Sequence, residues 1–307
     1  MSPRRFWIQR VYRFNKQMFP FFPNAVVFIL QFSVSYLILS KILNISLETS
    51  RMAQDLFVGS LSLVLFVYLF RCFDEVKDYA TDKINFPERP LPAGVLSLLD
   101  FYILQASVVA LLIVLNLGFT FQSSTKIGFA IVLLFTLFAS RWFFAENWIR
   151  PSLPLALLTH NPVVYLYQIY VLSFYSLQQD ILFSRAGLFL LSFAVTGTAW
   201  EISRKIRGTT EEDTYTTYSK IWGRSLPLIL VFLLLVSSFC LSIAAFINQG
   251  PSWLPALWVV PGFIIISLVW KILSFWKDQR KAPVFRTYVE IYMFSLIILC
   301  IPLYFLI

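Results

Sequence analysis

Nine long apolar segments run through this chain, and only short polar stretches separate them. Each has about the length that an α-helix needs to cross a bilayer, roughly 17–25 residues. A helix satisfies every backbone hydrogen bond of one segment within hydrocarbon. The sequence therefore predicts an all-α, polytopic membrane protein with about nine transmembrane helices. Their approximate bounds are 22–43, 55–73, 95–116, 126–145, 157–177, 183–200, 225–247, 253–273 and 287–307.

The composition excludes an ordinary soluble domain. Of the 307 residues, 58% are hydrophobic and 13% are charged, whereas soluble domains carry about 25% charged residues. The net charge of +9 does not indicate a nucleic-acid partner, because the basic residues flank the apolar segments. Three cysteines and the single histidine, His160, provide neither a disulfide framework nor the usual zinc spacing. They also argue against nucleophile–histidine chemistry.

The distribution of basic residues predicts the orientation of the chain. With the N-terminus inside, the cytoplasmic segments carry 21 of the 25 Lys and Arg residues, and the other side carries four. This asymmetry follows the positive-inside pattern. We therefore expect an integral membrane protein with a cytoplasmic N-terminus. Two polar stretches, 73–94 and 200–223, follow even-numbered spans and are predicted on the same cytoplasmic side.

Residues 1–20 form a basic segment that differs from the spans. Trp7, Val11, Phe14 and Met18 recur at helical spacing, and basic residues occupy the rest of the wheel. Such a pattern is typical of an amphipathic helix that lies on an anionic membrane surface and contacts membrane lipids. We expect this helix to precede one transmembrane domain, residues 21–307.

The first polar stretch contains a regular series of carboxylates. Asp74, Asp78 and Asp82 recur every four residues, so on a helix they share one face. Like charges at this spacing repel by about 0.2–0.5 kcal/mol per pair, which indicates that a cation sits among them. Oxygen ligands without His or Cys favour Mg²⁺. The alternative is a solvated helix whose charge is partly offset by Lys77 and Lys83.

Three prolines then end this helix. Pro87, Pro90 and Pro92 prevent it from continuing past Asn85. We expect the sequence PERPLPAG to form a rigid, extended turn that ends at Gly94 and holds Arg89 close to the carboxylates.

The second polar stretch combines basic and acidic residues. Fixed cations beside a metal site suit a diphosphate, whose negative charge grows as it leaves. The alternative is that the basic residues are ordinary positive-inside anchors. Two aromatic residues, Tyr215 and Tyr218, together with Trp222, could close a lid over a site or could lie in the interfacial belt. The basic residues are Arg204, Lys205, Arg207 and Lys220, around Glu201 and the trio Glu211, Glu212 and Asp213.

The series D-x3-D-x3-D followed by R-P-L-P-x-G, after the second of nine spans, resembles the UbiA superfamily of intramembrane prenyltransferases. The resemblance covers the layout of essentially the whole chain, whereas its motifs cover only the two polar stretches. It implies a helical bundle that binds a prenyl diphosphate through Mg²⁺ at two Asp-rich motifs. An allylic cation then alkylates a lipophilic acceptor, often an aromatic ring.

The resemblance also implies roles for residues of the first motif. Asp74 and Asp78 would be catalytic metal ligands, and Asp82 would be a third ligand or would support one. Arg89 would contact the diphosphate. Asp74 stands where the family usually has Asn, a change that a metal site tolerates.

The second motif departs from the family pattern, because D-x3-D is represented by Glu201-x3-Lys205. Glu201 would be a metal ligand, but a charged lysine does not bind Mg²⁺. One hypothesis is that Lys205, with Arg204, replaces part of the metal's charge and holds diphosphate directly as a catalytic group. The other is that Glu211, Glu212 or Asp213 supplies the missing ligand. The remaining substrate-binding candidates are Arg207, Tyr215 and Lys220.

Two other classes of function are compatible with parts of this pattern. An ion-coupled transporter would bury charge near mid-bilayer, whereas these acidic clusters lie at one face. A non-catalytic membrane scaffold would keep the bundle without the chemistry, and Lys205 is the residue that favours it. The sequence predicts a Mg²⁺-dependent prenyltransferase ahead of both.

Overall fold

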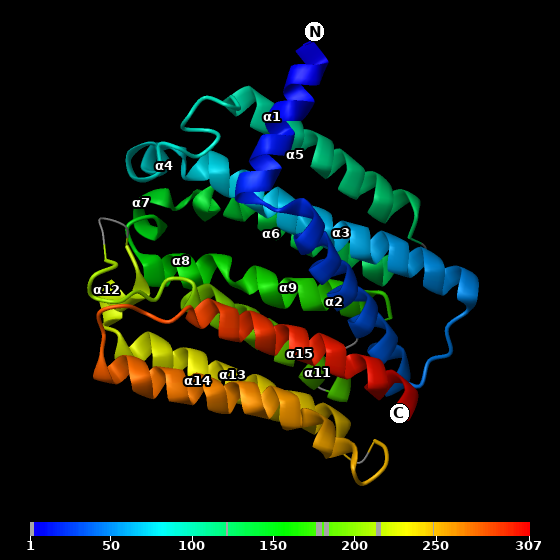
Figure 1. Cartoon of the computed structure of the whole chain (residues 1–307). Helices are drawn as coiled ribbons and strands as arrows, with labels where there is room; N and C mark the ends of the chain where they lie inside the picture. Colours follow the sequence, from blue (N-terminus) through cyan, green and yellow to red (C-terminus); the bar gives the residue numbers. More distant parts are fainter. Residues whose placement is uncertain (1–2, 121, 176–179, 181–183, 213–215, 248) are drawn as a thin grey trace. The chain divides into compact units, whose positions relative to one another are not determined.

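The computed structural model describes residues 3–120, 122–175, 180, 184–212, 216–247 and 249–307, and in that part of the chain all regular elements are helical (Figure 1). The chain divides into two compact units. Unit 1 comprises residues 1–33 and 48–146, and unit 2 comprises residues 34–47 and 147–307.

Seven helices of the described chain are long and apolar enough to cross a membrane, which indicates a multi-pass integral membrane protein. They cover seven of the predicted segments, and the count of nine stays a prediction. The helical spans are Phe21–Ile42 (α2), Thr49–Lys77 (α3), Leu98–Gly118 (α5 and η1), Arg185–Ser203 (α11), Ser225–Phe246 (α13), Leu254–Lys277 (η3 and α14) and Phe285–Leu306 (α15).

The other two predicted segments are shorter helices. The fourth becomes α6, Ser123–Ala139, because the chain leaves the helix in a turn after Ala139. The fifth becomes α8, Leu153–His160, and α9, Pro162–Ser173, with the break at Asn161. Pro162 lacks the N–H that would continue the preceding helix, so the break follows from the sequence. Residues 176 and 177 of this segment lie outside the described residues.

Unit 1 is built around α3. Helix α3 packs along α5, and the buried Asn116 side chain donates a hydrogen bond of 2.8 Å to Ser62 Oγ. The N-terminal helix α1, Pro3–Met18, turns part of the apolar face that is predicted to contact lipid toward unit 1. Phe14 on this face is fully buried and meets the Phe101 ring edge-on at 5.0 Å. Arg10 of α1 forms an ion pair of 3.1 Å with Asp100.

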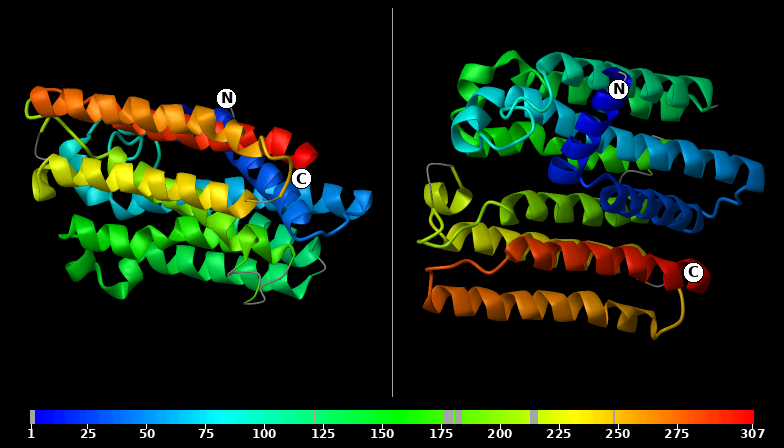
Figure 2. Two further views of the ribbon diagram at one scale, coloured as in Figure 1. Left: turned by 90° about the horizontal axis from the view of Figure 1, so that it is seen from below. Right: turned by 45° about the horizontal axis from the view of Figure 1, so that its top comes forward.

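Unit 2 is organised around α11. Helix α11 packs against α9, α13 and α15, and α14 packs against α13 and α15 (Figure 2). A buried network of hydroxyl groups joins α11, α13 and α15. Ser238 Oγ lies 2.9 Å from Thr196 Oγ1 and accepts a hydrogen bond of 3.2 Å from Tyr292.

Candidate functional site

The three aspartates of the first motif lie along one side of a nearly continuous helix. Asp74 is on α3, Asp78 is the junction residue, and Asp82 is on α4, Tyr79–Asn85. The Asp78 N–H donates to Asp74 O and the Asp82 N–H donates to Asp78 O, both at 2.8 Å. These are helical i to i−4 bonds, so each aspartate stands one turn from the next. The predicted end of the helix at Asn85 is confirmed.

A basic side chain is paired with each of the two outer aspartates. Lys77 Nζ lies 2.7 Å from Asp74 Oδ1, and Arg89 Nη1 lies 2.7 Å from Asp82 Oδ2. Arg89 also lies over the Phe86 ring, 4.0 Å from its centroid. The sequence predicts Arg89 near the carboxylates, and this is where the structure places it. These pairs offset the repulsion that the spacing of the aspartates creates.

Glu75 is a fourth carboxylate, next to Asp74 and outside the four-residue spacing of the aspartates. Its side chain is only 1% exposed and forms an ion pair with Arg71, one turn earlier on α3. The second carboxylate oxygen, Oε2, is buried without a hydrogen-bond partner. A buried charge with an unsatisfied oxygen is costly and points to a functional role. Its only sequence signal is that a carboxylate follows the first aspartate directly.

The segment 87–94 is a series of compact turns rather than the extended turn that its prolines suggest. The Ala93 N–H donates to Arg89 O at 2.9 Å, and the Val95 N–H donates to Pro90 O at 2.9 Å. Gly94 has a φ of +70°, which glycine adopts without strain. Proline fixes φ but not the turn that follows, so the extended interpretation was wrong.

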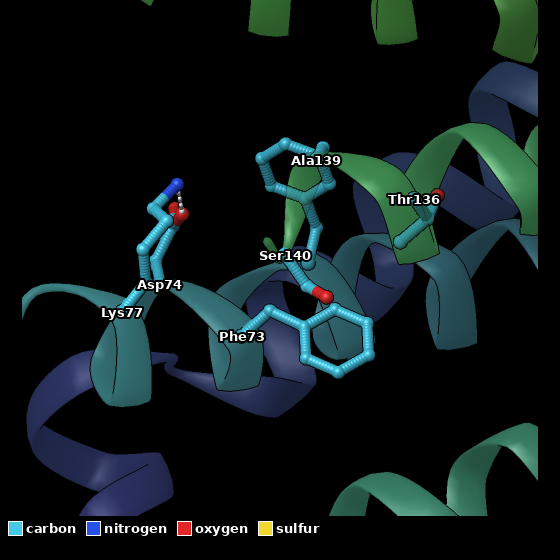
Figure 3. A pocket seen from close by; sticks show the side chains of 7 residues that line it. Phe73, Asp74, Lys77, Thr136, Ala139 and Ser140 are labelled. Carbon is cyan, nitrogen blue, oxygen red and sulfur yellow. Dashed lines mark hydrogen bonds and ion pairs between the residues drawn. The ribbon is translucent and has the colours of Figure 1, made fainter. Parts of the chain in front are cut away.

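A small pocket borders the first motif (Figure 3). Phe70, Phe73, Asp74 and Lys77 of α3 line one wall, and Thr136, Ala139 and Ser140 line the other. It is a shallow hollow open to solvent that encloses essentially no space, whereas typical ligand sites enclose roughly 300–1,000 Å³. The pocket alone does not hold a prenyl diphosphate.

The first motif has several of the carboxylate groups that Mg²⁺ prefers, and the second motif has one, Glu201. Asp74 and Asp82 have carboxylate oxygens, which are the ligands that Mg²⁺ prefers. Each of the two forms an ion pair with a basic side chain. Within the described residues, no three His, Cys, Asp or Glu side chains converge on one point. In the second motif Glu201 pairs with two basic side chains. Lys205 is a charged ammonium group and has no lone pair with which to bind a metal ion.

Glu201 is held firmly by its neighbours at the end of α11. Arg204 donates from Nε and Nη2 to the two oxygens of Glu201, at 2.6 and 2.8 Å. Lys205 Nζ lies 3.4 Å from Glu201 Oε1 and 5.9 Å from the centroid of the buried Tyr218 ring. The structure therefore brings Glu201, Arg204 and Lys205 together in unit 2.

Trp200 connects this group to the last helix. Its indole Nε1 donates a hydrogen bond of 3.0 Å to Glu290 Oε1, which also accepts from Arg286 Nε at 2.7 Å. The guanidinium groups of Arg204 and Arg286 each lie 5.4 Å from the centroid of the Trp200 ring. Arg286 and Glu290 carry no motif, so only the fold identifies them as part of this cluster.

Glu211 and Glu212 act within their own loop. Glu211 Oε2 accepts backbone N–H bonds from Gly208 and Ala282, at 2.8 and 2.9 Å, and so joins the loop after α11 to the α14–α15 loop. Glu212 Oε1 accepts a hydrogen bond of 2.6 Å from Ser219. Both carboxylates are thus engaged within the loops, and their role as the missing metal ligand stays a prediction. Asp213 and Tyr215 lie outside the described residues.

The remaining candidates of the second stretch flank this loop. The Arg207 N–H donates to Ser219 Oγ at 2.9 Å, and Lys220 is exposed on the short helix α12, Tyr218–Trp222. The Tyr218 and Trp222 rings stack at 5.0 Å. This stack is compatible with both the lid and the belt interpretation.

Gly208 permits the two loops to touch. A Cβ atom at this position would lie 2.2 Å from Arg280 O. Gly208→Ala should therefore force the loops apart and destabilise the protein by about 1–3 kcal/mol, the usual cost of overpacking. Thermal unfolding in detergent measures the effect. Gly118→Ala is the control, because nothing lies within 4 Å of its Cβ position, and equal losses in both variants would contradict the contact.

Glu211 makes this loop junction sensitive to acid. Burial raises the pKa of its carboxyl group, but the N–H donors of Ala282 and Gly208, with Lys281 and Arg207 nearby, outweigh burial and lower the pKa overall. A carboxyl group with a lowered pKa stabilises the fold above its unfolded pKa, about 4.3. That contribution disappears as the pH falls through the folded value.

We therefore expect the Gly208 and Ala282 amides to lose hydrogen-exchange protection below about pH 4.3. Protection factors, which correct for the intrinsic pH dependence of exchange, are the quantity to measure. Glu211→Gln should lower protection at neutral pH and remove the dependence. A variant that keeps the acid transition would show that another group controls it.

Comparison with known proteins supports the fold. No protein-family model matches the sequence, and no curated protein matches it. A solved structure from work on digeranylgeranylglyceryl phosphate synthase in membranes matches with a TM-score of 0.60, over 96% of this chain and 98% of that chain. The sequence identity is 16%, so the likeness shows a shared fold and nothing finer. At that level it agrees with the helical bundle that the sequence resemblance implies.

Proposed function

We propose that this protein is a Mg²⁺-dependent prenyltransferase, which moves an isoprenoid group from a prenyl diphosphate to a hydrophobic acceptor within the membrane. One observation carries the proposal. A ladder of aspartates one helical turn apart, Asp74, Asp78 and Asp82, stands at the end of a candidate span in a chain that shares the fold of a membrane prenyltransferase.

The residues of the first motif would hold the metal and one end of the diphosphate. Asp74 and Asp78 are the proposed ligands, and Asp82 is a third ligand or fixes Arg89 for contact with the diphosphate. Glu75, buried beside Asp74, joins this set on the strength of its unsatisfied oxygen. Bound Mg²⁺ would neutralise charge on the leaving diphosphate.

The second stretch would supply fixed positive charge. Lys205, supported by Arg204, would bind the diphosphate directly in place of a metal-bound carboxylate. Glu201 remains a proposed metal ligand, and its carboxylate also orients these two side chains. Arg207, Lys220 and Tyr215 remain proposed contacts at the edge of the substrate.

The reaction then needs only positioning and charge stabilisation from the chain. The bond between C1 of the prenyl group and oxygen breaks, and its electron pair leaves with the diphosphate. The allylic carbon forms a new bond to a nucleophilic atom of the acceptor, which gives up a proton. Aromatic side chains that exclude water protect the cation before capture.

We further propose nine spans in one transmembrane domain, residues 21–307, with α8 and α9 together as the fifth span. The basic helix of residues 1–20 and both polar stretches lie on the cytoplasmic side, as the 21-to-4 distribution of basic residues supports.

Release of diphosphate from a panel of prenyl diphosphates by purified protein tests the proposal. Candidate acceptors are included, because some transferases ionise the donor only when both substrates are bound. We expect release with Mg²⁺ and none with EDTA. A non-catalytic scaffold is the second candidate, favoured by the engagement of Glu201 with two cations. If folded protein releases no diphosphate with any donor and acceptor, the result would favour the scaffold.

A further inference from the structure

The ammonium group of Lys77 is almost fully enclosed, unlike that of an ordinary cytoplasmic lysine. Its side chain is 7% exposed. The Nζ atom lies 2.7 Å from Asp74 Oδ1 and 4.6 Å from the centroid of the Trp142 ring. Lysine is almost never buried without a partner, and here the partners are a carboxylate and an aromatic face. Lys83, six residues later, is exposed and lies over the Tyr79 ring.

The aromatic face belongs to a strained turn. Trp142, Phe143 and Phe144 follow one another with φ values of 51°, 51° and 60°, a region that bulky residues rarely adopt. Each such residue costs about 1–3 kcal/mol and persists only where its surroundings enforce it. Phe143 packs against Phe135 at 5.3 Å, and Phe144 packs against Phe138 at 6.0 Å. The turn thereby presents the Trp142 ring to Lys77.

This arrangement conflicts with a metal at Asp74 while Lys77 stays in place. Both are cations, and both would use the same carboxylate in a partly buried site, where like charges repel strongly. Lysine carries its charge on a flexible four-carbon stem with three donors. It can leave the carboxylate and still donate to another anion close by.

We propose that Lys77 is the internal counter-ion of Asp74, that metal binding displaces it, and that its ammonium group then binds the diphosphate beside the Trp142 ring. The empty site is thus neutralised without a metal. The charge becomes available to the substrate when the metal arrives. The inference rests on the proposed function in one respect, since it takes Asp74 as a metal ligand.

The proposal requires two effects of opposite sign from one substitution. Lys77→Met removes the competitor for Asp74, so Mn²⁺, measured by electron paramagnetic resonance without substrate, should bind about tenfold more tightly. The same variant loses a charged donor, so inorganic pyrophosphate at saturating Mn²⁺ should bind about tenfold more weakly. Lys83→Met is the matched control and should change neither affinity. Full-length protein in detergent serves for both titrations.

Two further variants separate the effect of the charge at position 77 from an effect on folding. Lys77→Arg should keep both affinities within about threefold of wild type, because it retains the cation. Lys77→Gln replaces Lys77→Met if thermal unfolding shows that the latter is misfolded.

If Mn²⁺ binds equally or more weakly to the neutral variant, Lys77 is not a competitor and the proposal fails. If the wild type binds neither Mn²⁺ nor pyrophosphate, the proposed function fails with it. If it binds both and neutral variants at Lys77 alter neither, only the Lys77 proposal fails.

Discussion

Replacing both Asp74 and Asp78 with alanine should abolish Mg²⁺-dependent release of diphosphate. Each substitution removes an oxygen donor from the only series of aspartates at helical spacing in the described chain. Loss of one group that stabilises developing charge typically costs about 10²–10³ in kcat. The double variant should therefore fall below detection, and each single variant should lose about 10²-fold or more. Release of diphosphate from the preferred donor measures the effect.

The control for this prediction is Glu88→Ala. Glu88 is an exposed carboxylate in the turn after the same helix, and no ion pair of Glu88 is found among the described contacts. Its loss should leave the rate within about twofold of wild type, as is usual for surface substitutions. Equal rates for the wild type and the double variant would remove the first motif from the mechanism.

Replacing Arg71 with methionine should have the largest effect on stability. Glu75, 1% exposed, would then lose its ion-pair partner, and the buried carboxyl group would have either to keep an unpaired charge or to take up a proton. Breaking a buried pair in this way costs about 3–5 kcal/mol. Because the Arg71 side chain is 27% exposed, water can reach the pair, and we expect a loss of about 3 kcal/mol. Unfolding by titration from mild detergent into SDS measures it.

The companion variant separates charge from packing. Arg71→Met combined with Glu75→Leu removes both charges and should recover most of the lost stability, since apolar replacement of a buried pair is often neutral. A double variant as unstable as Arg71→Met would mean that packing, and not the unpaired charge, is responsible. Its catalytic activity should still be lost if Glu75 belongs to the metal set.

The sequence predicts the spans well, because apolar length is a local property. It predicts their ends less well where charge pairing or turn geometry determines where the helix ends. The apolar span is predicted to end at 73, but helix α3 continues to Lys77, as the helical spacing of the aspartates predicts. The Arg71–Glu75 and Lys77–Asp74 pairs offset the charge of the added turn. Helix α6 ends at Ala139 rather than 145. The left-handed turn that follows is made of Trp and Phe, which give no turn signal.

The candidate site could be predicted only where it follows a repeat in the sequence. Asp74, Asp78 and Asp82 are evident from their spacing, and Arg89 from the prolines that surround it. Lys77 is a different case, because its importance depends on the Trp142 ring, in the segment after α6, which only the fold brings to it. Arg286 likewise joins Trp200 from a helix about ninety residues away. Contacts of this kind carry no local signature.

The most direct test of the central claim is transfer of a labelled prenyl group in membranes that contain the natural acceptor. Membranes of the cells that make the protein would be incubated with prenyl diphosphates labelled at C1, with Mg²⁺ or with EDTA. We expect label to enter a lipid-soluble product only with Mg²⁺ and only from membranes carrying the wild-type chain. Equal labelling by membranes carrying the Asp74→Ala/Asp78→Ala variant, or transfer that persists in EDTA, would contradict the account.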